Sequence, residues 1–280
     1  MGCTTSTMGN DVAKMAGLGP PTNKTGSSVV RKKVERASKT GVLSLTEHKL
    51  EAVPKIVCEQ LGGSASRLRT LDLSRNKLDK LPEQWNFPKL TTCNLSQNRL
   101  TRLPELGQAL KKLDASENRL TDVVSCLTNA EAHLEELSLS KNPSLGTGNL
   151  WPAVALLTRL TLLDVCGCGL RSLLDGSFSL PELVDLRADD NLIEAVDIAT
   201  KAPALRRLSL ARNRLQAQGI ATSLLRLSSL SHLDLQGNPL TKRQFLDVPG
   251  CDDFLKRREE HRKKQGGEFA EMGVCGLDDQ

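Results

Sequence analysis

One leucine-rich segment recurs along this chain, and the repetition restricts its possible folds more than any other feature. The segment LRTLDLSRNKL begins at Leu68, and an irregular earlier copy, TGVLSLTEHKL, begins at Thr40. Further copies begin at Leu90, Leu110, Leu134, Leu160, Leu183, Leu205 and Leu230. Successive copies start 20 to 28 residues apart, so the chain repeats one unit nine times.

The L-x-L alternation inside each copy predicts a short β-strand. Because side chains alternate across a strand, Leu71 and Leu73 point to one side and Asp72 points to the other. One strand cannot bury its apolar side alone, but stacked copies bury a continuous core. The period is that of a leucine-rich repeat. The sequence therefore predicts an α/β fold, a right-handed leucine-rich-repeat horseshoe of about nine repeats. It places a parallel sheet on the concave face and short helices or 3₁₀ turns on the convex face.

An asparagine follows nearly every predicted strand, at the point where the chain turns. Its side-chain amide is suited to bond the backbone of that turn and so to form a ladder through the solenoid. Cys168 takes this place in one copy and His48 in the first copy, while Ala115 and Ala188 replace core leucines. The asparagines are Asn76, Asn98, Asn118, Asn142, Asn191, Asn213 and Asn238.

Both ends of the predicted repeat domain, residues 42–249, are followed by helical patterns that can cover it. Residues 28–41 predict an N-terminal capping helix that stops at a glycine. Residues 250–265 predict a C-terminal capping helix with acidic residues first and basic residues last, in which Phe254 and Leu255 close the last layer. Residues 1–27 and 266–280 lack periodicity, so the sequence predicts a flexible leader and a flexible tail.

The opening residues MGCTTSTMGN match a lipidation pattern. Gly2 with Ser6 fits the N-myristoylation pattern, and Cys3 is placed for a palmitoyl chain. One myristoyl chain gives marginal binding, an association constant of roughly 10⁴ M⁻¹, so a second acyl chain has an energetic purpose. The other interpretation is an ordinary tail in which Gly2 happens to follow Met1. The basic residues from Arg31 to Lys33 either strengthen membrane binding or form the solvated face of the capping helix.

The sequence as a whole predicts a protein at the cytosolic face of a membrane, with a cytoplasmic pool. No apolar run approaches the roughly 18 residues needed to cross a bilayer, and the first residues lack the features of a secretory signal. The eight cysteines are then expected to be thiols. The plasma membrane or a ciliary or flagellar membrane suits a doubly acylated protein.

The chain resembles the cytosolic proteins grouped as leucine-rich repeat-containing protein 57. The resemblance runs from VERASKTGVLSLTEHKLEAVP through LRTLDLSRNKLDKLP to GNPLTKRQFLDVPGCDDFLKRREEHRKK and covers about residues 34–265. It implies N-myristoylation at Gly2 and no enzymatic activity. The longer leader and the irregular later repeats depart from the family pattern, so the resemblance does not carry over a partner.

Reactive motifs are missing from the sequence. It contains no phosphate-binding glycine loop, His-Glu-x-x-His or Cys-x-x-Cys, so we expect no enzyme, cofactor or metal. Cys166 and Cys168 are expected in a core and turn, with redox or metal sensitivity as the alternative. Asp189 and Asp190 are expected to be solvated rather than a catalytic pair. The net charge of +5 is too small to indicate nucleic-acid binding.

The exposed positions of the strands predict a protein-binding surface that is acidic in its middle and mixed towards the C-terminal repeats. Such a surface suits a partner segment that carries Lys or Arg. The alternative is that these charges only keep the solenoid soluble. The candidate partner-binding residues are Asp72, Asp114, Glu117, Glu136, Asp164, Asp185, Arg187, Arg207 and Arg212.

Two functional hypotheses follow from the sequence. The first is a non-enzymatic adaptor or scaffold, tethered to a membrane by acylation at Gly2 and Cys3, that binds a protein on the repeat surface. The second is a soluble regulatory subunit that wraps a cytosolic enzyme such as a protein phosphatase. Fractionation of Gly2→Ala and Cys3→Ser variants separates the two hypotheses.

Overall fold

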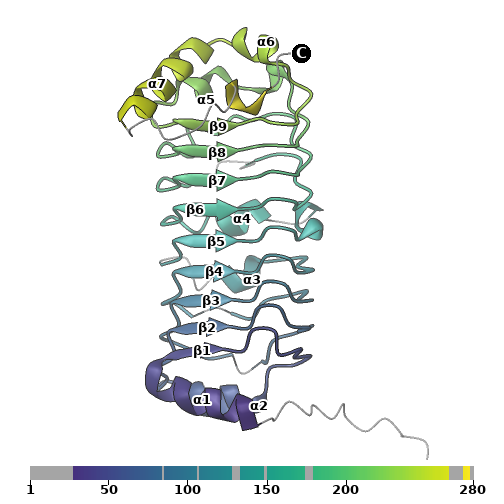
Figure 1. The fold of residues 1–280 in the computed structure, drawn as a ribbon, viewed down its shortest axis with the longest axis vertical. Helices are drawn as coiled ribbons and strands as arrows, with labels where there is room; N and C mark the ends of the chain where they lie inside the picture. Colours follow the sequence, from purple (N-terminus) through teal and green to yellow (C-terminus); the bar gives the residue numbers. More distant parts are fainter. Residues whose placement is uncertain are drawn as a thin grey trace, which may run out of the picture.

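The fold is an open parallel sheet built from one short strand per repeat (Figure 1). The computed structural model describes residues 28–83, 85–105, 107–127, 133–147, 150–173, 179–264 and 274–277. Within these ranges the strands pair in sequence order, from β1 to β9, in one nine-stranded sheet. The strands are β1 Val42–Ser44, β2 Thr70–Asp72, β3 Thr92–Asn94, β4 Lys112–Asp114, β5 Glu136–Ser138, β6 Leu162–Asp164, β7 Asp185–Arg187, β8 Arg207–Ser209 and β9 His232–Asp234. The predicted α/β leucine-rich-repeat solenoid is therefore confirmed.

The middle residue of each strand points into the core, as the L-x-L pattern predicts. In β2, Leu71 is fully buried and lies in register with Leu43 on one side and Cys93 on the other. A second buried row follows two residues later, where Leu73 occupies one layer and Ala115 another. Stacking these rows removes both apolar columns from water, which no single three-residue strand could do.

The asparagine that follows most of the strands ties neighbouring repeats together. Asn98 Oδ1 accepts the Leu78 N–H at 3.0 Å, and Asn98 Nδ2 donates to the carbonyls of Leu73, Leu95 and Ser96 at 3.0, 3.0 and 3.2 Å. Because buried backbone groups need partners, each amide replaces bonds that the turn would otherwise lack. Bonds of the same type are made by Asn76, Asn118, Asn142, Asn191, Asn213 and Asn238.

Two repeats depart from the asparagine ladder where the sequence predicts it. Cys168 is buried, and its Sγ lies 3.2 Å from the Leu139 carbonyl to which an amide would donate. In the first repeat, His48 Nδ1 lies 2.7 Å from the Thr46 carbonyl, a contact within its own turn. Neither side chain forms the set of cross-repeat amide bonds, so the ladder is weaker at these two places.

The residue before each of these turn positions adopts a left-handed backbone conformation. The φ angles are +55° at Gln97, +56° at Lys141 and +63° at Gly167. Most repeats place a residue with a side chain there, although only glycine adopts this region without cost. The turn geometry is thus imposed by the register of the solenoid rather than by the local residue.

Short helices and irregular segments return the chain from one strand to the next. Figure 1 shows α3 and α4 behind the sheet, whereas the connections from β2 to β3 and from β3 to β4 carry no helix in their described residues. These helices, with 3₁₀ segments η1 and η2, are α2 Lys55–Leu61, α3 Val124–Leu127, η1 Pro143–Thr147, α4 Leu150–Val154, η2 Ala217–Gly219 and α5 Thr222–Arg226.

The N-terminal end of the solenoid is covered by α1, Ser28–Thr40. Val30, Val34 and Ala37, spaced for one helix face, are buried against the first repeat. The helix ends where Gly41 takes φ +75° and its N–H donates to the Ala37 carbonyl at 2.8 Å. A Cβ at Gly41 would lie 2.7 Å from the Arg67 carbonyl oxygen, so the glycine also allows close packing on the next repeat.

The C-terminal end is covered by α6, Lys242–Leu246, and α7, Cys251–Lys264. Thr241 caps α6, since its side chain accepts the Gln244 N–H and the Gln244 side chain accepts the Thr241 N–H. Phe245 and Phe254 are fully buried, and Leu255 packs partly buried against the core. These side chains close the last leucine layer.

The prediction of a flexible tail over 266–280 is wrong for its described part. The short 3₁₀ segment η3, Val274–Gly276, packs against β9, and Cys275 is 2% exposed. The Cys275 carbonyl accepts the Leu235 N–H at 2.9 Å, in the same way that the Asp234 carbonyl accepts the Leu210 N–H. Apolar Cys275 and Leu277 supply the burial that holds the segment in place. Residues 274–277 thus add one backbone hydrogen bond to the solenoid beyond the last strand, β9.

Candidate protein-binding surface

The candidate partner-binding residues lie on the face of the sheet opposite the leucine core. The first and third residues of the strands point away from the buried middle residue, and most are partly or fully exposed. The third positions hold Asp72, Asp114, Asp164 and Arg187, the first positions hold Glu136, Asp185 and Arg207, and the left-handed turn positions hold Glu117 and Arg212. The sheet therefore brings these residues onto one face.

The aspartates at the third positions also build the turns that follow. Asp72 Oδ1 accepts the Ser74 N–H at 2.9 Å, and Asp114 Oδ1 accepts the Ser116 N–H at 3.0 Å and its hydroxyl at 2.6 Å. Asn94 makes the same contact to the Ser96 N–H at 3.0 Å without a charge. The oxygen acceptor is therefore what the turn requires, and the negative charge is additional.

Two of the predicted acidic residues are paired with lysines of a neighbouring repeat. Glu136 lies 2.6 Å from Lys112, and Glu117 lies 3.0 Å from Lys141. The hydrogen bond from Lys141 lowers the pKa of Glu117. Since all four side chains remain substantially exposed, these pairs contribute little stability. They do cancel charge, so the acidic region is narrower than the sequence predicts.

Asp185 is the centre of a three-residue ion cluster rather than an exposed contact. Its side chain is 6% exposed, and Oδ2 lies 3.1 Å from both Arg187 and Arg207. The hydrogen bond with Asp185 raises the pKa of Arg187. The cluster carries one net positive charge. The sequence places all three residues on this face but does not reveal that Asp185 is buried beneath the two arginines.

When the candidate residues in these ion pairs are set aside, three candidate aspartates are left, and they form an acidic stripe. We define the acidic stripe as Asp72, Asp114 and Asp164, the third residues of β2, β4 and β6. Every second strand contributes one member, so successive members lie about 10 Å apart. Asp189 extends the negative region, although its Oδ1 accepts the Ala211 N–H at 2.7 Å and the Ser209 hydroxyl at 2.6 Å.

Arg212 pairs with Asp190 at the C-terminal end of this face. Two guanidinium nitrogens of Arg212 lie 2.6 and 2.8 Å from the two carboxylate oxygens. This bidentate pair raises the pKa of Arg212 and lowers that of Asp190, through the hydrogen bonds between them. Asp189 thus serves a turn, and Asp190 forms an ion pair.

The two cysteines in the turn after β6, the half-buried Cys166 and the buried Cys168, are poor nucleophiles. Burial, together with Asp164, raises the pKa of the Cys166 thiol, and burial raises the pKa of Cys168 to about 11. No group of three or more potential metal ligands occurs among the residues that the structure describes.

Gly2 and Cys3, the predicted acylation sites, lie outside the described residues. In the part of the chain with described coordinates, no helix has the length and hydropathy to span a bilayer.

Comparison with known proteins agrees with the fold. A model of the Leucine Rich Repeat family matches residues 67–87. An internalin (InlF) from Listeria monocytogenes superimposes with a TM-score of 0.61 at 19% identity, covering 77% of this chain and 60% of that chain. A structure of Latrophilin 3, Unc5D and FLRT2 (LRR) in an octameric complex gives a TM-score of 0.58 at 25% identity, covering 71% and 61%. The fold of this chain is therefore a leucine-rich-repeat solenoid.

Geranylgeranyl transferase type-2 alpha subunits match this chain over less than a third of its length. Over 88 residues it is 39% identical to the geranylgeranyl transferase type-2 subunit alpha of Bos taurus, and over 84 residues it is 40% identical to that of Homo sapiens. The bovine match covers 31% of this chain and 16% of the transferase subunit. Because the chain spans so little of that subunit, the similarity does not establish enzyme activity.

Proposed function

We propose that this protein is a non-enzymatic adaptor that binds another protein on the sheet face and is held at a membrane by N-terminal acylation. The observation that carries the proposal is the acidic stripe of Asp72, Asp114 and Asp164, whose charges the turns do not need. Leucine-rich-repeat folds are typically binding scaffolds, and FLRT2 (LRR) occurs in a complex with other proteins. The extended sheet supplies a binding surface of this kind.

The spacing of the stripe indicates the kind of partner. Three residues of an extended chain span about 10 Å, which is the separation of alternate strands. In the polyproline II conformation, which has three residues per turn, side chains at every third position also share one face, so a partner segment with Lys or Arg at those positions would place one cation over each aspartate. Such complementarity would mainly raise the association rate and the specificity.

Charge-neutral substitutions test the stripe without removing its turns. Asp114→Asn/Asp164→Asn keeps an oxygen acceptor at each turn, as Asn94 does, and removes two charges. Pull-down or proximity labelling from the native cell should recover the partner with wild type and with a Glu59→Lys/Glu182→Lys control, both exposed residues elsewhere. Equal recovery by the Asp→Asn variant would rule out the stripe as the binding site.

The membrane tether is supported by the pattern at Gly2, Cys3 and Ser6. A myristoyl chain alone binds marginally, so Cys3 acylation would be needed for stable residence at the plasma membrane or a ciliary or flagellar membrane. Wild type should fractionate with membranes, Gly2→Ala should be soluble, and Cys3→Ser should be intermediate. If all three are equally soluble, the protein acts as the alternative, a soluble regulatory subunit.

A further inference from the structure

A column of basic residues runs along one flank of the first four repeats. In each repeat the residue directly after the turn asparagine, or after His48 in the first repeat, is Lys or Arg. Backbone hydrogen bonds between successive repeats place these residues one above another. The N–H groups of Lys77, Arg99 and Arg119 are the donors, at 2.8, 2.9 and 2.9 Å. In each bond the acceptor is the carbonyl of the residue directly after the basic residue of the preceding repeat. We call this set the basic flank column, and its members are Lys49, Lys77, Arg99 and Arg119.

The four side chains of the basic flank column are exposed, and within the described residues none of them makes an ion pair or a hydrogen bond. Their backbones lie one strand spacing apart, about 4.8 Å, so like charges adjoin. Exposed Glu51 and Asp79 lie in the turns that follow and offset the field only in part. The column ends after the fourth repeat, where the equivalent position holds Pro143.

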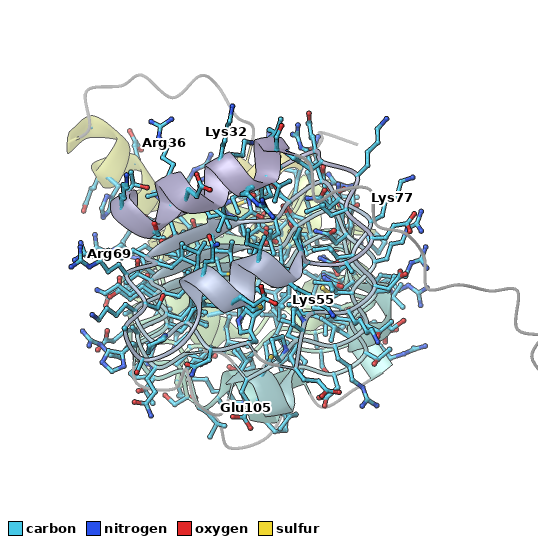
Figure 2. All side chains as sticks on the ribbon, turned by 90° about the horizontal axis from the view of Figure 1, so that it is seen from below. Lys32, Arg36, Lys55, Arg69, Lys77 and Glu105 are labelled. Carbon is cyan, nitrogen blue, oxygen red and sulfur yellow. The ribbon has the colours of Figure 1, made fainter. Side chains whose placement is uncertain are left out.

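The capping helix α1 adds positive charge at the same end of the solenoid. Arg31, Lys32, Arg36 and Lys39 are exposed, whereas Lys33 donates to the Ser44 carbonyl at 3.1 Å. Figure 2, viewed from the N-terminal end, shows Lys32 and Arg36 projecting from α1 away from the repeats and Lys77 projecting from their flank. Glu35 is the one acidic residue of the helix, and exposed Val29 lies one turn before Lys32.

We propose that the basic flank column and the outer residues of α1 bind the headgroups of anionic phospholipids. The N-terminal repeats then lie against the bilayer instead of hanging from a tether. This inference rests on the proposed membrane location of the protein, and acylation of the segment that precedes α1 would strengthen the binding without being required for it. A random coil of about 30 residues spans roughly 30 Å, so an acylated N-terminus would hold these cations at a high effective concentration near the membrane. Each basic residue at an anionic leaflet strengthens binding about fivefold.

Vesicle sedimentation of the full-length, non-acylated protein tests the inference separately from the tether. The probe is vesicles of about three parts phosphatidylcholine to one part phosphatidylserine, compared with phosphatidylcholine alone. We expect binding to the anionic vesicles only, with loss at high salt because the charges are exposed. Lys77→Glu/Arg99→Glu/Arg119→Glu should weaken this binding at least about tenfold.

A charge-matched control variant separates the effect of the basic flank column on vesicle binding from the effect of total charge. Arg159→Glu/Arg206→Glu/Arg214→Glu makes the same change at exposed sites in later repeats, and Arg214 occupies the equivalent flank position. It should weaken binding less than about threefold. Equal loss in both triple variants, or no loss in the column variant, would overturn the proposal. Binding of a soluble phosphoserine peptide without any binding to vesicles would overturn the lipid assignment.

Two further measurements exclude trivial explanations. Thermal unfolding of each triple variant, and of the milder Lys77→Gln/Arg99→Gln/Arg119→Gln variant, shows whether the solenoid still folds. Sedimentation of the acylated wild type with phosphatidylcholine vesicles reports the tether alone. If that association is absent while the column dependence remains, the proposed tether fails and the lipid-binding column stands.

Discussion

Asn98 and Leu78 belong to successive repeats, and the Asn98 side-chain oxygen accepts the Leu78 backbone N–H at 3.0 Å. The same amide nitrogen reaches carbonyls on both repeats, so one buried side chain satisfies the backbone of two layers. Similar cross-repeat bonds recur along the described solenoid.

The first prediction concerns this amide. Asn98→Ala leaves one buried N–H and several carbonyls without their partner, so the free energy of unfolding should fall by roughly 2–4 kcal/mol. Asn238→Ala, at the partly buried end of the ladder, should lose less. Urea unfolding of both variants measures the difference, and equal losses would contradict the dependence on burial.

The second prediction uses the left-handed turn position. Gln97→Gly should stabilise the solenoid by roughly 0.5–1 kcal/mol, because glycine adopts φ +55° without strain. Gly167→Ala should destabilise it by about 1 kcal/mol, since a Cβ there meets Lys141 only at 3.6 Å and the penalty is conformational. Melting temperatures that move in the opposite directions would contradict this account.

The third prediction concerns the buried thiols. Burial raises the pKa of Cys126 to about 12, from an ordinary value of 9.0. Because the folded state favours the protonated thiol, its stabilising contribution is complete below pH 9 and is lost as the pH rises towards 12. The free energy of unfolding should fall by about 1.4 kcal/mol per pH unit for such a thiol. The decline should be shallower in Cys126→Ala, and an identical slope would contradict the assignment.

The fourth prediction tests the hydrogen bond between the Leu235 N–H and the Cys275 carbonyl. Leu277→Ser places a polar group at a 6% exposed site and should loosen Val274–Gly276 from β9. Hydrogen exchange at the Leu235 amide, which donates to Cys275, should then accelerate by at least about tenfold. Exchange at the Leu210 amide, one strand inward, is the internal control and should change much less.

The sequence was sufficient to predict the elements whose cause is local or periodic. The strands follow from L-x-L alternation, and the ladder follows from an asparagine at one fixed place in each repeat. Ala115 and Ala188 are buried in the row of leucines, as the pattern predicts. Each of these features needs only the repeat spacing.

Other features depend on which residue faces which across two repeats. The pairing of Glu136 with Lys112 and the burial of Asp185 beneath Arg187 and Arg207 follow from the register of the sheet. Aligning the first and third strand positions in columns would have placed opposite charges side by side. The docking of Val274–Gly276 gives no comparable signal, because the segment lies far from β9 in sequence and carries no repeat pattern.

Cys168 has a mechanical consequence for the molecule. A thiol forms weaker hydrogen bonds than an amide. The interface between the repeats of β5 and β6, which Cys168 bridges, is therefore less stable than the interfaces that Asn98 bridges. A stack whose stability resides in nearest-neighbour interfaces opens first at its weakest one. Under a pulling force, this protein should part near its middle into two blocks of repeats before either block unravels.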